Sequence, residues 1–110
     1  MENLETLKKE IADHLSYLDV ESAILFGSHA YGHPTLDSDI DLYIITKDNY
    51  IPESYGEKRI IVRKISNALI DIRLKVNLDL LVHTLPMNKK FYAINSSFAQ
   101  EIKKRGIRIL

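Results

Sequence analysis

The sequence predicts an α/β fold in which a small β-sheet is flanked by helices on one or both faces. Two patterns of apolar residues support this fold class: one repeats every three or four residues, and the other is confined to short runs or to alternate positions. Along the chain these patterns follow the order helix, strand, strand, helix, strand, helix. A chain of 110 residues has the size of one domain, so we expect residues 1–110 to form a single unit with one core.

Three segments have apolar side chains at helical spacing. The first, at 4–18, carries one stripe of leucine and isoleucine residues, which predicts a packing helix. The second, at 61–72, has the same pattern and is preceded and accompanied by basic residues. The third, at 91–102, is followed by a basic run and by Gly106, which are typical of the end of a helix.

The segments between these helices read as strands. Residues 23–26 form an apolar run that ends at Gly27, and 77–83 and 107–110 are further strand candidates. In 39–46 apolar and polar residues alternate, which is typical of a strand with two different faces. The segment 47–56 reads as a loop.

The composition limits the classes of function. Without cysteine the chain has no disulfide, no thiolate nucleophile and no cysteine-based zinc site, which is compatible with the cytoplasmic location we expect. No apolar run is long enough to cross a membrane, and the N-terminal segment is too charged for a signal peptide, so we expect no membrane partner.

The net charge is zero, but the charges are divided unevenly along the chain. Residues 1–56 hold three basic and eleven acidic groups, whereas residues 57–110 hold twelve basic and four acidic groups. A neutral total argues against nucleic acid as the main partner, and the basic second half weakens that argument.

A polar stretch at 29–38 follows the first predicted strand and should form a turn with about one turn of helix. Gly27 at its start allows the backbone to approach a ligand, and the following amides with the Ser28 hydroxyl can donate to phosphate oxygens. Taken alone, a Gly-Ser pair is a weak signal for phosphate binding, because such pairs are common in ordinary turns.

Three carboxylates are placed where they can share a site. Alternation puts Asp39 and Asp41 on one face of their strand, where they repel each other unless solvent, a proton or a cation relieves them. Asp79 lies within an otherwise apolar strand and is expected to face a polar site. Carboxylates beside a phosphate-binding loop are suited to Mg²⁺ and a nucleoside triphosphate, whereas the alternative is a sheet edge with solvated acids.

The spacing of these residues resembles a known family. Gly27-Ser28, ten intervening residues and Asp39-x-Asp41 look like the signature of the polymerase-beta-like nucleotidyltransferases, in their minimal-nucleotidyltransferase branch. Asp79 matches the position of the third carboxylate of this family. The resemblance covers residues 20–110 and implies the nucleotidyltransferase fold, with a small mixed β-sheet flanked by helices.

The resemblance implies an enzyme that transfers a nucleoside monophosphate from a nucleoside triphosphate to a hydroxyl, with Mg²⁺ as two ions. In this interpretation Gly27 and Ser28 are nucleotide-binding residues that hold the β- and γ-phosphates. Asp39, Asp41 and Asp79 are the metal ligands and catalytic residues, and Asp79 serves the acceptor side.

One departure concerns the cations near the triphosphate. Relatives often carry Arg directly after Gly-Ser and again two positions later, where this chain has His29 and Tyr31. Positive charge must then come from a protonated His29 or from elsewhere. One candidate is a basic face formed by Lys58, Arg59, Arg63 and Lys64, for which the alternative is a solvated helix surface.

The small size indicates the acceptor. Stand-alone minimal versions resemble the antitoxin half of HEPN/MNT toxin–antitoxin systems, whose partner is a separately encoded helical HEPN ribonuclease. This resemblance implies an antitoxin that transfers AMP from ATP to a tyrosine of a HEPN toxin. Two alternatives stay open: the same chemistry on a small-molecule hydroxyl with a site completed by self-association as a homo-oligomer, and a non-catalytic module that only binds its partner.

Overall fold

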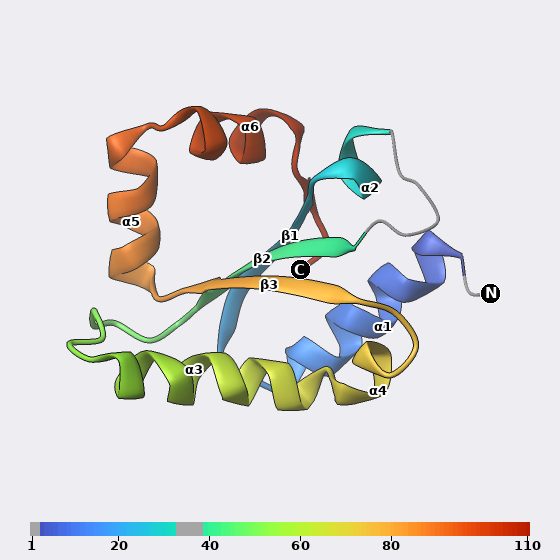
Figure 1. Ribbon diagram of the computed structural model, residues 1–110, viewed down its shortest axis with the longest axis horizontal. Coiled ribbons are helices and arrows are strands. Elements are labelled where there is room, and N and C mark those ends of the chain that lie inside the picture. The colour runs from blue at the N-terminus through green and yellow to red at the C-terminus, as the bar shows by residue number, and fades with distance from the viewer. Residues whose placement is uncertain (1–2, 33–38) are drawn as a thin grey trace.

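A computed structural model describes residues 3–32 and 39–110 as a four-stranded sheet with helices on both sides (Figure 1). The strand order is β3-β2-β1-β4. The elements are α1 (Leu4–Ser16), β1 (Val20–Phe26), α2 (Ser28–Tyr31), β2 (Ile40–Thr46), α3 (Tyr55–Ala68), α4 (Ile70–Arg73), β3 (Leu78–His83), α5 (Leu85–Ile94), α6 (Ser97–Arg105) and β4 (Ile107–Arg108).

The sheet is mixed, as the predicted fold class requires. Strand β1 pairs antiparallel with both β2 and β4, whereas β2 and β3 run parallel. The parallel pair is connected through α3 and α4, which cross beneath the sheet (Figure 1). The α/β fold with flanking helices is therefore confirmed.

Each face of the sheet has its own apolar core. On one face Leu42 and Ile44 pack with side chains of α1, α3 and α4, including Ile11 and Ile65. On the other face Tyr43 and Ile45 pack with side chains of α5 and α6 (Figure 1). The predicted alternation within 39–46 is confirmed, and the face expected to be polar becomes apolar beyond Asp41 because Tyr43 is fully buried.

Side-chain caps fix where the longer helices begin. The Asn3 carboxamide accepts a hydrogen bond from the Thr6 amide at 2.8 Å, and the Ser54 hydroxyl accepts one from the Glu57 amide at 3.1 Å. In α1 the predicted stripe is buried at every turn, although Leu18 contacts the core from beyond the end of the helix. Among the described residues no helix combines the length and apolar character needed to cross a membrane.

The predicted helix at 91–102 is wrong in one respect, because the structure has two helices there. Asn95 adopts a left-handed conformation with φ of 56° and ends α5, and the Ser96 hydroxyl caps α6 by accepting from the Ala99 amide at 3.1 Å. The chain turns at this point, so Ile94 is 69% exposed and does not continue the apolar stripe.

Two other expectations differ at their margins. The first strand begins at Val20, three residues before the predicted run, because Val20 and Ser22 also pair with β2, with an irregularity in the register between them. The expected helical turn in the polar stretch is confirmed as α2, whereas the predicted turn over 33–38 lies outside the described residues.

Candidate active site

The strand pairings bring the candidate residues to one end of the sheet. Asp41 is the direct neighbour of Asp79 in the parallel β2–β3 pair. On its other side Asp41 is opposite Phe26, the last residue of β1, so Gly27 and Ser28 follow immediately beside it. Residues that are separated by up to 52 positions in the sequence therefore meet at the edge where β2 and β3 begin.

Gly27 is in direct contact with the Asp41 carboxylate. Its φ of 76° with ψ of −160° is a conformation that only glycine adopts without strain, and a Cβ atom at this position would collide with the Asp41 carboxylate. The Gly27 carbonyl accepts from the amides of Ala30 and Tyr31, both at 3.0 Å, and so opens the short helix α2. Glycine at position 27 thus allows both the turn and the close approach of the carboxylate.

Asp41 is the electrostatic centre of the group. Partial burial, the carboxylate charges of Asp79 and Asp39, and a hydrogen bond with Asp79 raise the pKa of the Asp41 carboxyl, and His29 opposes this rise. His29 therefore lies near enough to Asp41 to act on its charge.

Asp79 and Asp39 act on the Asp41 carboxyl in different ways. Asp41 and Asp79 share a hydrogen bond, whereas Asp39 influences Asp41 only through its charge. Asp39 and Asp79 are both exposed, and Asp41 is half-buried. Within residues 3–32 and 39–110, no three acidic or histidine side chains form a ready-made metal-binding group.

The donor set nevertheless fits a hard divalent cation. Carboxylate oxygens are the ligands that Mg²⁺ prefers, and Mg²⁺ is usually held by one or two carboxylates together with substrate phosphates. Burial and then the charge of Asp79 raise the pKa of Asp41, so a partly buried carboxylate lies close to a second one at this point. Asp41 and Asp79, with Asp39 beside them, are the residues that would hold such an ion.

Arg105 is a residue near the site that the sequence did not indicate. From the end of α6 its guanidinium lies 4.3 Å from the centre of the Tyr31 ring, and its Nη2 donates to the Tyr31 carbonyl at 3.4 Å. The basic run at 103–105 reads in the sequence only as the end of a helix, and no spacing rule connects residues 31 and 105. Only the packing of α6 beside α2 reveals the contact (Figure 1).

The basic face of α3 is not part of this site. Asp41 shares its sheet face with Tyr43, which packs against α5 and α6, whereas α3 packs against the opposite face through Ile61 and Ile65. The sheet therefore lies between Arg59 and Arg63 of α3 and the face that carries Asp41, whereas the charge of Lys58 still reaches His83 on the edge strand β3.

A buried polar contact anchors α5 below the carboxylates. The Tyr43 hydroxyl donates to Oδ1 of Asn88 at 2.8 Å and lies 2.8 Å from Nδ1 of His83. With the hydroxyl proton given to Asn88, His83 donates from Nδ1. Burial, and secondarily the charge of Lys58, lower the pKa of His83, which keeps the imidazole neutral near neutral pH.

Solved structures with this fold include toxin–antitoxin complexes. A MntA-HpeT toxin–antitoxin mutant is similar with a TM-score of 0.55 and 16% identity, over 94% of this chain and 71% of that chain. A toxin–antitoxin with AMP-PNP has a TM-score of 0.57 and 18% identity, over 94% of this chain and 72% of that chain. A putative nucleotidyltransferase from Sulfolobus solfataricus has a TM-score of 0.53 and 20% identity, over 79% and 71% of the two chains.

Sequence comparison leads to the same fold. No curated protein matches the sequence significantly. The family described as "Polymerase beta, Nucleotidyltransferase" matches residues 5–110, which include Gly27, Ser28 and all three carboxylates. Since the match spans nearly the whole chain, this protein belongs to the polymerase beta nucleotidyltransferase family.

Proposed function

We propose that this protein is a Mg²⁺-dependent adenylyltransferase that transfers AMP from ATP to a tyrosine hydroxyl of a HEPN toxin and thereby acts as its antitoxin. The observation that carries the proposal is the Asp41–Asp79 pair held against the Gly27-Ser28 turn. The two carboxylates repel each other and would be stabilised by a bound cation. They lie directly beside the Gly27 backbone, which a phosphate group can approach.

The nucleotide is proposed to enter over Gly27. Without a side chain at this position the backbone offers close approach, and the short helix α2 begins directly after it at Ser28, whose hydroxyl can donate to a phosphate oxygen. A similar structure that contains AMP-PNP, an ATP analogue, supports ATP as the substrate. The expected location is the cytoplasm, where ATP is available.

The proposed reaction forms a bond between the acceptor oxygen and the α-phosphorus of ATP. The bond from that phosphorus to the bridging oxygen of the β-phosphate breaks, and pyrophosphate leaves. Mg²⁺, when bound with ATP as two ions, supplies positive charge that offsets repulsion among carboxylates and phosphates. Asp39, Asp41 and Asp79 would hold the metal, and Asp79, which is exposed, would also accept the proton of the acceptor hydroxyl.

A partner protein is the acceptor that this chain suits best. The three carboxylates lie at one end of the sheet, where Asp39 and Asp79 are exposed to an approaching macromolecule. Two similar structures are described as toxin–antitoxin complexes, which supports a toxin as the partner.

Label transfer from ATP to a co-expressed HEPN partner tests the proposal. With Mg²⁺ and ATP labelled at the α-phosphate, we expect the partner to gain label and the mass of one or more AMP groups. Replacing both Asp39→Ala and Asp41→Ala should abolish transfer, because the metal charge is then no longer held.

Asp13→Ala is the matched control, because Asp13 is an exposed acid on α1 and should leave transfer unchanged. Transfer that persists in the double variant would contradict the assignment of Asp39 and Asp41 as catalytic residues. Label found only on an added small-molecule hydroxyl would exclude the toxin as acceptor.

A further inference from the structure

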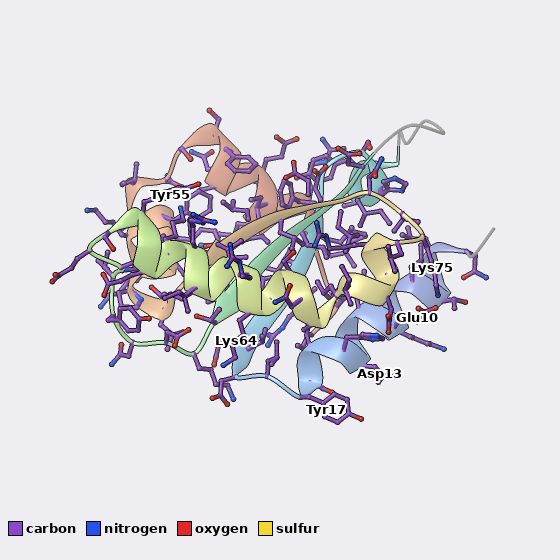
Figure 2. All side chains as sticks on the ribbon, turned by 60° about the horizontal axis from the view of Figure 1, so that its bottom comes forward. Glu10, Asp13, Tyr17, Tyr55, Lys64 and Lys75 are labelled. Atoms are coloured by element: carbon purple, nitrogen blue, oxygen red, sulfur yellow. The ribbon has the colours of Figure 1, made fainter. Side chains whose placement is uncertain are left out.

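The outer side of α3 carries a basic groove of about 600 Å³. Its walls include Lys58, Arg59, Arg63 and Arg73, and none of its lining residues is a carboxylate. Tyr55 stands at the N-terminal end of α3 and Val62 contributes an apolar surface between the basic side chains (Figure 2). We call these residues the α3 groove.

The α3 groove cannot serve the nucleotide bound at the carboxylates. Helix α3 lies on the sheet face opposite to Asp41 and is joined to the sheet by the buried side chains of Ile61 and Ile65. The sheet lies between a triphosphate beside Gly27 and the α3 cations Arg59 and Arg63, although the charge of Lys58 reaches His83 on the edge strand β3. The cations of the groove therefore need a different explanation.

The positive charge of the groove is not balanced by the described part of the chain. No ion pair joins Lys58, Arg59, Arg63 or Arg73 to a carboxylate within residues 3–32 and 39–110. Two of the guanidinium groups are instead held in place by neutral partners. Arg73 donates to the Ser66 hydroxyl at 2.6 Å, and Arg59 lies 5.9 Å from the centre of the Tyr55 ring.

Arginine in a fixed orientation binds carboxylates and phosphates through paired hydrogen bonds, so the ligand must be anionic. Three observations favour a protein over nucleic acid. Tyr55 is 78% exposed and Val62 adds apolar surface, and a groove that combines tyrosine and arginine has the composition of protein interfaces. The chain also has no net charge, whereas binding to a nucleic acid backbone depends on a broad positive field.

The third observation is the position of the acidic residues. Helix α1 packs beside α3 and α4 and carries Glu10 and Asp13, which lie on the same side of the molecule as the basic helix (Figure 2). Glu10 is paired with Lys75 at 3.1 Å, and the exposed Asp13 would repel a phosphate backbone that extends past the groove. These acids would not hinder a short acidic segment confined to the groove.

We propose that the α3 groove binds an acidic segment of a partner protein. This docking goes beyond the proposed transfer of AMP and does not require it. If the partner is the modified toxin, the groove holds it at a second point, on the face of the sheet opposite the reacting hydroxyl.

Fluorescence polarisation with a short labelled peptide of alternating glutamate and leucine tests this proposal on the full chain. The peptide is expected to bind, and Arg59→Glu with Arg63→Glu should weaken binding by about tenfold or more, since two attractive contacts become repulsive. Lys89→Glu with Lys90→Glu makes the same change of net charge on exposed residues of α5 and should have little effect. Arg59→Gln with Arg63→Gln provides a milder variant if the first does not fold.

Several results would overturn the proposal. Absence of peptide binding, or equal losses in the α3 and α5 variants, would show that the groove has no specific role. Tighter binding of a single-stranded RNA of similar length, lost in the α3 variant, would identify a nucleic-acid surface instead. A dimer in light scattering that only the α3 variant abolishes would identify a second copy of this chain as the occupant.

The test is independent of catalysis. The Asp39→Asn and Asp41→Asn double variant should bind the peptide as the unmodified chain does. Peptide binding without any transfer activity would support docking at the α3 groove and reject the proposed AMP transfer. Transfer without peptide binding would support the AMP transfer and reject the docking.

Discussion

Gly27 and Asp41 constrain each other, because the glycine backbone occupies the space that a side chain would need beside the carboxylate. Gly27→Ala should destabilise the fold by about 2 kcal/mol, since alanine would be strained at a φ of 76° and would also displace Asp41. Urea unfolding measures this cost.

Gly56→Ala is the matched control, because this glycine lies in the first turn of α3 and an added Cβ would meet only the Ser54 hydroxyl at 3.8 Å. It should be neutral or stabilise by about 0.5 kcal/mol. Equal effects of the two replacements would contradict the tight packing described for Gly27.

Asp41 has an effect on stability that depends on pH. A carboxyl whose pKa is raised by folding holds its proton more tightly in the folded state, so its contribution is favourable at low pH and is lost as the pH rises through the folded pKa. At neutral pH and without Mg²⁺, Asp41→Asn should therefore stabilise the protein, by about 0.5 kcal/mol after solvent screening of this partly exposed group.

Thermal unfolding at several pH values checks this sign. The advantage of the Asn variant should shrink as the pH falls through the raised folded pKa of Asp41, and it should be lost below the ordinary carboxyl pKa of 3.8, where Asp41 is protonated in both states. Asp13→Asn on α1 provides a control without a carboxylate neighbour of this kind. A destabilised Asp41→Asn protein at neutral pH would show that repulsion does not dominate at this position.

At the scale of elements, Arg105 connects the end of α6 to α2. The contact with Tyr31 is worth about 0.5 to 1 kcal/mol at an exposed site and holds the short helix that begins at Ser28. If the turn at Gly27-Ser28 binds phosphate as proposed, we expect Arg105→Ala to raise the KM for ATP several-fold with a smaller change in kcat, because α2 follows this turn directly.

Steady-state transfer assays with varied ATP measure this split. Arg105→Lys should not restore the KM, because a lysine ammonium lacks the planar group that stacks on the ring. Lys104→Ala is a control on the same turn of α6 and should leave both constants unchanged. If Arg105→Ala and Lys104→Ala behave alike, α2 does not depend on the contact.

The elements themselves were predictable where one local signal dominated. The stripe of α1 and the alternation of β2 follow directly from residue spacing, and both are confirmed. The break between α5 and α6 was missed because Phe91, Ile94 and Phe98 keep helical spacing across it. The Asn95-Ser96 pair was the available signal, since asparagine adopts left-handed conformations and serine caps helices.

For the molecule as a whole, the fold gives the uneven charge distribution a spatial meaning. Asp41 faces the α5–α6 side of the sheet, whereas Arg63 lies beyond the other side on α3. A neutral total therefore conceals an acidic site and a basic groove on opposite faces. Because the two lie apart, we propose separate roles for them: catalysis at the acidic site and partner docking at the basic groove.

The sequence by itself determined the fold class, the family and the kind of chemistry available, because residue spacing and residue type are local properties. Glycine before a helical turn, carboxylates at alternate positions and a third carboxylate on a later strand are all visible in the chain. Only the tertiary structure decided that Asp79 pairs with Asp41, that Arg105 reaches Tyr31 and that the α3 cations lie away from the site. Those relations depend on strand register and helix packing between distant segments, which local patterns do not fix.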